Sequence, residues 1–147
     1  KSNIHRNGLS ASVNIKKGQK IIQYKGKKVT LQKTESDPKY DNDKPIYLFT
    51  LNKRYDFDGD FKFNTARLIN HSCEPNCEVL EDKGQLWIFA LRDIKKNKEL
   101  TYDYGFSFDK DYKQYICKCG SKNCVGYIVR EGSRWRIKKA KSALASR

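Results

Sequence analysis

Five cysteines are the residues whose spacing most directly indicates chemistry. Three of them, Cys117, Cys119 and Cys124, form a C-x-C-x4-C pattern with a glycine-containing turn. Such a turn can bring three thiolates onto one metal ion, and zinc takes four soft ligands in a tetrahedron. Cys73 or Cys77 can supply the fourth ligand. An odd number of cysteines argues against a closed set of disulfides, so the alternative to zinc is a group of reduced, buried thiols.

The elements that must position these residues are short. β-prone runs bounded by turn residues cover residues 12–15, 19–24, 46–51, 77–80, 85–91 and 99–104. Residues 77–80 and 85–91 flank an Asp-Lys-Gly turn, which predicts a hairpin. Residues 32–45 are polar and contain two prolines, so we expect a loop or insertion there with one short helix. Frequent turns without a long amphipathic pattern predict a mainly β domain.

Composition limits the classes of function. The chain has 147 residues and 37% hydrophobic residues, enough for the core of one domain. No apolar run approaches the roughly 18 residues that a membrane helix needs. The start at Lys1 and the lack of methionine indicate a fragment of a longer chain. The net charge of +14 lies in residues 1–50 and 101–147, while residues 51–100 are neutral. Basic ends favour polyanionic partners, with solvated surface as the alternative.

Two segments resemble the signatures of SET-domain lysine methyltransferases. They are Arg67-Leu-Ile-Asn-His-Ser-Cys-Glu-Pro-Asn76 and Glu99-Leu-Thr-Tyr-Asp-Tyr-Gly105. The cysteine motif resembles that family's post-SET zinc motif, and residues 2–9 and 15–26 resemble its first cofactor loop and the strand after it. The resemblance implies a mainly β SET-domain fold of small curved sheets with a knot-like core. The Asn70 and Tyr104 segments are then expected to thread past each other, a rare arrangement.

The same resemblance divides the chain into three parts. Residues 1–107 are expected to form the SET domain, with a variable insert at about 31–62. Residues 108–130 are expected to form the zinc-binding post-SET segment. Residues 131–147, which are rich in arginine and lysine, are expected to form a basic C-terminal tail, with the start of a helix as the alternative.

The activity that the resemblance implies is methyl transfer from S-adenosylmethionine to a lysine nitrogen of a protein. The amine must attack opposite the sulfonium, so positioning supplies most of the catalysis. Lysine must first lose its proton, which an apolar channel and a neighbouring cation favour. Tyr104 is the implied catalytic tyrosine, and Tyr24 and Tyr102 are further channel residues, with buried core tyrosines as the alternative. A tyrosine at position 102 predicts that the reaction stops at mono- or dimethyllysine.

The resemblance also implies binding residues. Cofactor contacts are expected at His5, Asn7, Tyr47, Asn70, His71 and Lys118. Zinc is expected at Cys73, Cys117, Cys119 and Cys124, which leaves Cys77 as a buried thiol with a minor claim to be the fourth ligand. The sequence departs from the family at Arg6, where the loop usually has glycine. A glycine there allows close backbone approach, so Arg6 is expected to alter cofactor affinity or the loop itself.

A protein with a basic, lysine-containing tail, most often a histone, is the implied substrate. This places the protein in the nucleus on chromatin, or in a host nucleus if the source is a microbe, without membrane contact. Asp56, Asp58 and Asp60 are expected to accept the basic peptide, while the basic ends contact nucleosomal DNA. Two alternatives remain open: a non-catalytic zinc module that binds nucleic acid, and an inactive SET homologue. The sequence does not indicate the oligomeric state.

Overall fold

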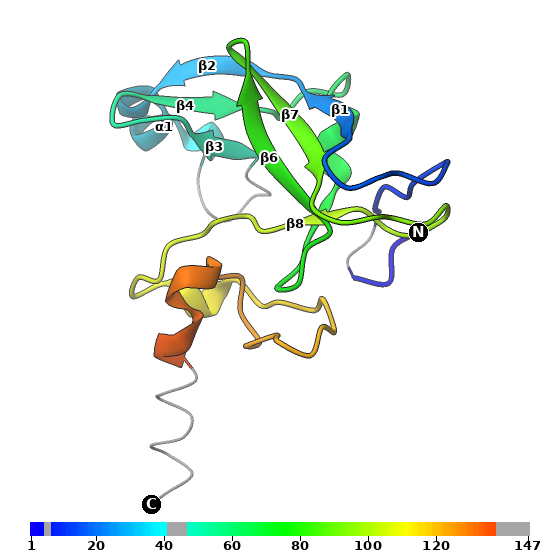
Figure 1. Cartoon of the computed structure of the whole chain (residues 1–147). Helices are drawn as coiled ribbons and strands as arrows, with labels where there is room; N and C mark the ends of the chain where they lie inside the picture. The colour runs from blue at the N-terminus through cyan, green and yellow to red at the C-terminus, as the bar shows by residue number, and fades with distance from the viewer. Residues whose placement is uncertain (5–6, 41–46, 138–147) are drawn as a thin grey trace, which may run out of the picture. The chain divides into compact units, whose positions relative to one another are not determined.

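The computed structural model describes residues 1–4, 7–40 and 47–137 (Figure 1). The strands are β1 Lys20–Tyr24, β2 Lys27–Thr30, β3 Leu48–Thr50, β4 Tyr55–Asp58, β5 Asn70–His71, β6 Cys77–Asp82, β7 Gln85–Ala90 and β8 Thr101–Tyr102. The helical elements are α1 Leu31–Ser36 and the 3-10 turns η1 Pro38–Tyr40, η2 Thr65–Leu68, η3 Tyr112–Gln114 and η4 Glu131–Ser133. The prediction of a mainly β fold is confirmed. In the part of the chain described, no helix is both long and apolar enough to cross a membrane.

The strands form three small sheets. One has the order β1-β7-β6, a second has the order β2-β4-β3, and the third pairs β5 with β8. The predicted hairpin is present as β6 and β7, joined at Lys83 and Gly84, which have φ of 51° and 75°. Two consecutive positive φ values are typical of the tight turns whose twist matches that of a hairpin. The predicted short helix of the polar insertion is α1.

The chain divides into two compact units, which are described separately. The first contains Lys1–Ile21, Leu68–Val79 and the chain from Phe89 onward, and the second contains Ile22–Arg67 and Leu80–Ile88. In the second unit, β4 pairs antiparallel with both β2 and β3, so Asp58 lies opposite Lys27 and Leu48. The first unit holds the β5–β8 pair and all four cysteines of the predicted zinc site. Most of the predicted chemistry therefore belongs to the first unit.

An additional small core lies near the C-terminal end of the described chain. Val125, Val129 and Ile137 are buried together. Phe108, Tyr112 and Tyr127 pack against them, and the ring centroids of Tyr112 and Tyr127 are 5.1 Å apart. These contacts give the segment after the last cysteine an apolar anchor within the first unit.

Candidate functional site

The two signature segments lie side by side in the first unit. β5 and β8 run parallel, with Asn70 opposite Thr101 and His71 opposite Tyr102. The backbone N–H of Ser72 donates to the Tyr102 carbonyl at 3.2 Å, so the pairing continues beyond the strands. Parallel strands cannot be joined by a tight hairpin, which explains why segments so far apart in the sequence meet here. This adjacency agrees with the expected passage of the two segments past each other.

Tyr104 lies at the centre of an aromatic cluster. Its hydroxyl donates to the backbone carbonyl of Ile69 at 3.0 Å. Its ring centroid lies 4.9 Å from that of Tyr102 and 5.8 Å from that of Phe106. The phenol is therefore held by both its ring and its oxygen. A fixed, neutral phenol among aromatic rings can orient an amine without adding a charge to its surroundings.

The His71 side chain connects the aromatic cluster to the cysteines. The ring is buried, and Nδ1 accepts a hydrogen bond from the backbone N–H of Tyr104 at 3.2 Å. With Nδ1 as an acceptor, the other ring nitrogen, Nε2, faces the sulfur of Cys73 at 3.6 Å. Histidine residues and thiolates of metal sites are commonly oriented by such second contacts. From the sequence His71 also competes as a zinc ligand, while the resemblance assigns it to the cofactor and gives zinc to Cys73; the structure places the His71 ring beside that cysteine.

Asn70 connects β5 to the N-terminal loop. Its Nδ2 lies 3.0 Å from the carbonyl of Asn7 and 2.8 Å from Oε1 of Glu99. The same carboxylate accepts from the hydroxyl of Ser2 at 2.6 Å. A Cβ on Gly8 would collide with the carboxylate of Glu99, so a larger residue at this position would displace that carboxylate. These four hydrogen-bonded residues bring amide, carbonyl and carboxylate atoms together. The oxygen acceptors among them suit the ammonium group of an amino acid.

Four of the five cysteines form one cluster. The sulfur atoms of Cys73, Cys117, Cys119 and Cys124 all lie within 4.8 Å of one another. The sulfurs of Cys73 and Cys117 are 3.8 Å apart. Zinc–sulfur bonds of about 2.3 Å in a tetrahedron place two sulfurs about 3.8 Å apart, so this donor set fits zinc. Backbone N–H groups of Cys73 and Gly126 point at the sulfurs of Cys119 and Cys124, both at 3.4 Å.

Mutual hydrogen bonds shift the pKa values of neighbouring thiols in opposite directions. A hydrogen bond from Cys117 lowers the pKa of Cys73, and the same bond raises the pKa of Cys117. Neighbouring thiolates repel each other, so one thiol stays protonated beside a thiolate. A bound divalent cation offsets this repulsion and allows all of the thiols to lose their protons. Cys77 differs, because burial raises its pKa to about 11. Its sulfur donates to the Asn76 side chain at 3.3 Å and lies outside the cluster.

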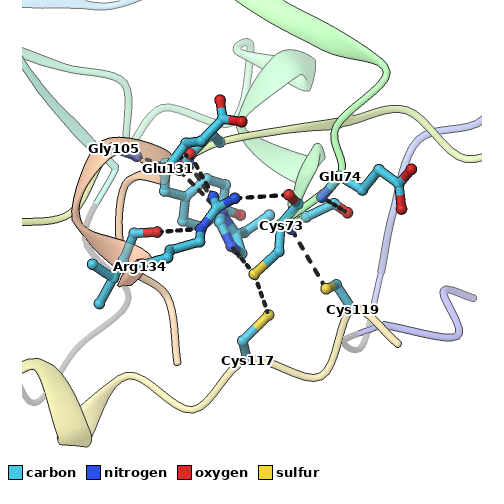
Figure 2. A network of polar contacts seen from close by, with 12 residues as sticks. Cys73, Glu74, Gly105, Cys117, Cys119, Glu131 and Arg134 are labelled. Atoms are coloured by element: carbon cyan, nitrogen blue, oxygen red, sulfur yellow. Dashed lines mark hydrogen bonds and ion pairs between the residues drawn. The ribbon is translucent and has the colours of Figure 1, made fainter. Parts of the chain in front are cut away.

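Arg134 is a buried residue of the site that sequence reasoning missed. Figure 2 shows its guanidinium directed at the backbone carbonyl of Cys73. Another of its nitrogens donates to the carboxylate of Asp103 at 2.6 Å. Because lysine and arginine crowd around Arg134, the sequence predicted a basic tail or the start of a helix there, and neither prediction indicated that Arg134 is buried. The spaced apolar residues Val125, Val129 and Ile137 are the signal that could have indicated a packed segment instead.

Tyr24 and Tyr47 lie together in the second unit. The Tyr24 side chain is 1% exposed, and its hydroxyl donates to the carbonyl of Tyr47 at 3.3 Å. Its ring packs edge-on against Phe49 with centroids 4.6 Å apart. A Cβ on Gly59 would collide with the Tyr24 ring. The guanidinium of Arg67 lies 5.3 Å from the centroid of the Tyr47 ring. Both tyrosines are therefore fixed within their own unit.

Two further predicted cofactor residues are exposed to solvent. Lys118 is exposed between two cysteines of the cluster, and the side chain of Asn7 is exposed while its carbonyl accepts from Asn70. His5 and Arg6 lie outside the described residues.

The predicted acidic docking segment is wrong. Asp56 and Asp58 are 4% and 2% exposed, and Asp60 is the exposed member of the three. Asp58 accepts hydrogen bonds from Lys39 at 2.5 Å and from the Tyr40 hydroxyl at 3.0 Å. Asp56 accepts from Thr34 at 2.7 Å. The carboxylates are used inside the second unit because alternate residues of β4 point inward.

Comparison with known proteins matches residues 6–105 to the SET domain. The chain is 38% identical over 134 residues to the histone-lysine N-methyltransferase trithorax of Drosophila virilis. It is 39% identical over 134 residues to histone-lysine N-methyltransferase 2B of Homo sapiens. It is 38% identical over 136 residues to the H3 lysine-4 specific histone-lysine N-methyltransferase of Emericella nidulans. Each match covers 87% of this chain but spans 3%, 5% and 11% of the respective relative. Together with the paired signature strands and the four-cysteine cluster, these matches show that the chain belongs to the SET-domain family.

Proposed function

We propose that this protein transfers a methyl group from S-adenosylmethionine to a lysine side chain of a histone. The observation that carries the proposal is the anchored Tyr104, whose hydroxyl bonds to Ile69 beside the β5–β8 pair. Relatives named histone-lysine N-methyltransferase support the histone as substrate. One of them is named for H3 lysine-4, which makes that residue the first position to examine. Nuclear, chromatin-associated localisation follows from such a substrate.

The predicted site residues have different parts in this proposal. Tyr104 orients the lysine nitrogen through its hydroxyl, while Tyr102 limits the space for methyl groups already present. The surrounding rings exclude water, which favours the neutral amine that can act as a nucleophile. Tyr24 is proposed as a further channel residue. S-adenosylmethionine, when bound, supplies a methyl group on a positively charged sulfur. The residues that would hold it are His5, Asn7, Tyr47, Asn70, His71 and Lys118.

Zinc is proposed as a structural ion. Cys73, Cys117, Cys119 and Cys124 would hold it with no coordination position left for a substrate, as in structural rather than catalytic zinc sites. Its role is to attach residues 117–124 to the β5 segment, since Cys73 lies two residues after that strand. The SET domain over 1–107, the post-SET segment over 108–130 and the basic tail from 131 remain our proposed division.

Binding to nucleosomal DNA is a second part of the proposal. Four lysines, Lys27, Lys28, Lys33 and Lys39, line a pocket of about 410 Å³ in the second unit. Lys39 is paired with Asp58, and Asp37 also lines the pocket, so four lysines against two carboxylates leave an excess of two positive charges. Clusters of lysine attract phosphate groups regardless of base sequence. Replacing Lys27, Lys28 and Lys33 by glutamine should lower DNA affinity. It should also reduce the salt dependence of binding, by about 0.9 in slope for each phosphate that is no longer neutralised.

The experiment is a methyl-transfer assay with labelled S-adenosylmethionine, using free histones and whole nucleosomes as substrates. Label in histone lysine, mapped by mass spectrometry, is the predicted result. Cofactor binding without label in any histone would indicate the inactive homologue. Nucleic-acid binding without cofactor binding would indicate the non-catalytic zinc module. Either result would refute the proposed function.

A further inference from the structure

The guanidinium of Arg134 donates hydrogen bonds to three different residues. Nε donates to the carbonyl of Val129 at 2.8 Å, and Nη1 donates to the carbonyl of Cys73 at 2.7 Å. Nη2 donates to Oδ2 of Asp103 at 2.6 Å. The residue is 6% exposed, although it lies in one of the most basic stretches of the sequence. A buried charge is stable only when it is paired and hydrogen-bonded, and this one is.

The carboxylate of Asp103 accepts hydrogen bonds from its own segment and from the segment that contains Arg134. Oδ2 also accepts from the backbone N–H of Glu131 at 3.0 Å, and Oδ1 accepts from the N–H of Gly105 at 3.0 Å. Gly105 has a positive φ of 72°, so the chain turns sharply directly after Tyr104. The two neighbours of Tyr104 in the chain, Asp103 and Gly105, are therefore both held in place.

A backbone bond adds to this attachment. The N–H of Arg130 donates to the carbonyl of Phe106 at 2.9 Å. Residues 130–134 are thus attached to residues 103–106 by side-chain and backbone hydrogen bonds. Figure 2 shows this network extending from Arg134 through Cys73 toward Cys117 and Cys119.

We propose that Arg134 is a positioning residue that couples the four-cysteine cluster to Tyr104. Through Cys73 it contacts the chain that supplies one sulfur of the cluster, and through Asp103 it holds the turn that carries Tyr104. The segment after the last cysteine thereby becomes part of the support of the active site. The inference rests on the proposed function for its effect on methyl transfer, while the coupling itself is a property of the fold.

An arginine is required because three acceptors lie around one planar group. The guanidinium presents five N–H donors in a rigid fork, whereas lysine has one nitrogen on a flexible stem. Arg134→Lys keeps the charge but leaves at least one of the carbonyls of Val129 and Cys73 without its donor. We therefore expect Lys to fail as a replacement, and this failure separates positioning from charge.

The test compares Arg134→Lys and Arg134→Ala with Arg136→Lys and Arg136→Ala. Arg136 is exposed on the same segment, with its guanidinium 5.5 Å from the rings of Phe108 and Trp135. The change in charge is the same at both positions. Four quantities are measured: hydrogen exchange of the Gly105 and Glu131 amides, the rate of zinc release to a chelator, kcat per cofactor-binding site, and KM for a histone peptide.

The predicted result is specific to Arg134. Both of its variants should show faster exchange at Gly105 and Glu131 and faster zinc release. Their kcat should fall, by up to about 100-fold if Tyr104 moves by an ångström, with little change in KM. The Arg136 variants should resemble wild type in all four quantities. Arg134→Lys behaving like Arg136→Lys would overturn the inference.

A second variant keeps the test decisive if Arg134→Ala does not fold. Asp103→Asn retains an oxygen acceptor for neighbouring N–H groups but loses the charge that faces Arg134. It should also accelerate exchange at Glu131 and zinc release, and unchanged values would count against the coupling. If wild type transfers no methyl group, the proposed function fails, yet exchange and zinc release still decide whether Arg134 couples the two sites.

Discussion

The backbone N–H of Tyr104 donates to Nδ1 of His71 at 3.2 Å, which joins the two signature segments through a side chain as well as through strand pairing. The ring centroids of these residues are 5.4 Å apart with an angle of 64°. The other ring nitrogen faces Cys73. His71 thus lies between the phenol proposed for catalysis and the sulfurs proposed for zinc. We therefore expect that a change in the position of either group alters the position of the other.

Tyr102 is predicted to limit the number of methyl groups added. Its side chain is 7% exposed and its ring lies against Tyr104. Tyr102→Phe removes one oxygen and keeps the ring packing, so it gives a methylated amine more room. Mass spectrometry of the product should show a shift toward di- and trimethyllysine. The same product distribution as wild type would contradict this role.

The cysteine cluster is predicted to bind one zinc ion per chain. Cys124→Ser removes one of four thiolates and should abolish stoichiometric zinc, measured by elemental mass spectrometry. Hydrogen exchange in residues 117–130 should rise, because structural zinc sites stabilise their segments directly. Cys77→Ser is the matched control, since that buried thiol lies outside the cluster. Full zinc content in Cys124→Ser, or its loss in Cys77→Ser, would be inconsistent with the assigned ligands.

Asp58 is predicted to make stability depend on pH. Burial alone would raise its pKa, but hydrogen bonds from Lys39, the backbone of Asp60 and Tyr40 outweigh burial and lower it. A pKa lowered by folding means that the carboxylate stabilises the native state above its unfolded pKa of about 3.9. This stabilisation is lost as pH falls through the folded value. Asp58→Asn should cost about 1–3 kcal/mol at neutral pH, and the difference from wild type should shrink in acid.

The exposed pair of Lys16 and Asp93 provides the control for this prediction. Their nitrogen and oxygen are 3.0 Å apart, with side chains 81% and 62% exposed. Exposed pairs contribute little because water screens them. Urea unfolding of Asp93→Asn should therefore show a smaller loss of stability than Asp58→Asn. Equal losses at all pH values would argue against a special contribution from Asp58.

The local features of the fold could be predicted from sequence because they depend on neighbours in the chain. The β6–β7 hairpin follows from alternation around Lys83 and Gly84, and the three late cysteines are close in sequence. The fourth ligand could not be chosen from spacing alone, since Cys73 and Cys77 both lie far from the motif. The resemblance to the family selected Cys73, and the sulfur positions agree with it.

Pairings between residues far apart in sequence could not be predicted from composition. Arg134 lies 61 residues from Cys73 and 31 from Asp103, so the sequence around it does not show which partners bury its charge. Asp58 likewise resembled an exposed acidic residue. Its partner Lys39 lies in the polar insertion, and the sequence does not show that the two side chains meet. In both cases a charge that is usually exposed is buried by a partner of opposite charge.

The most direct test of the central claim is the single-turnover rate of methyl transfer by Tyr104→Phe. Tyr115→Phe is the matched control, because the Tyr115 ring also packs against Phe106, with centroids 4.9 Å apart. Tyr104→Phe should retain its zinc and bind S-adenosylmethionine but lose about 100- to 1,000-fold in rate, the effect of removing one polar group aimed at the reacting atoms. Tyr115→Phe should keep a rate near that of wild type. A Tyr104→Phe rate equal to wild type would contradict the account of this site.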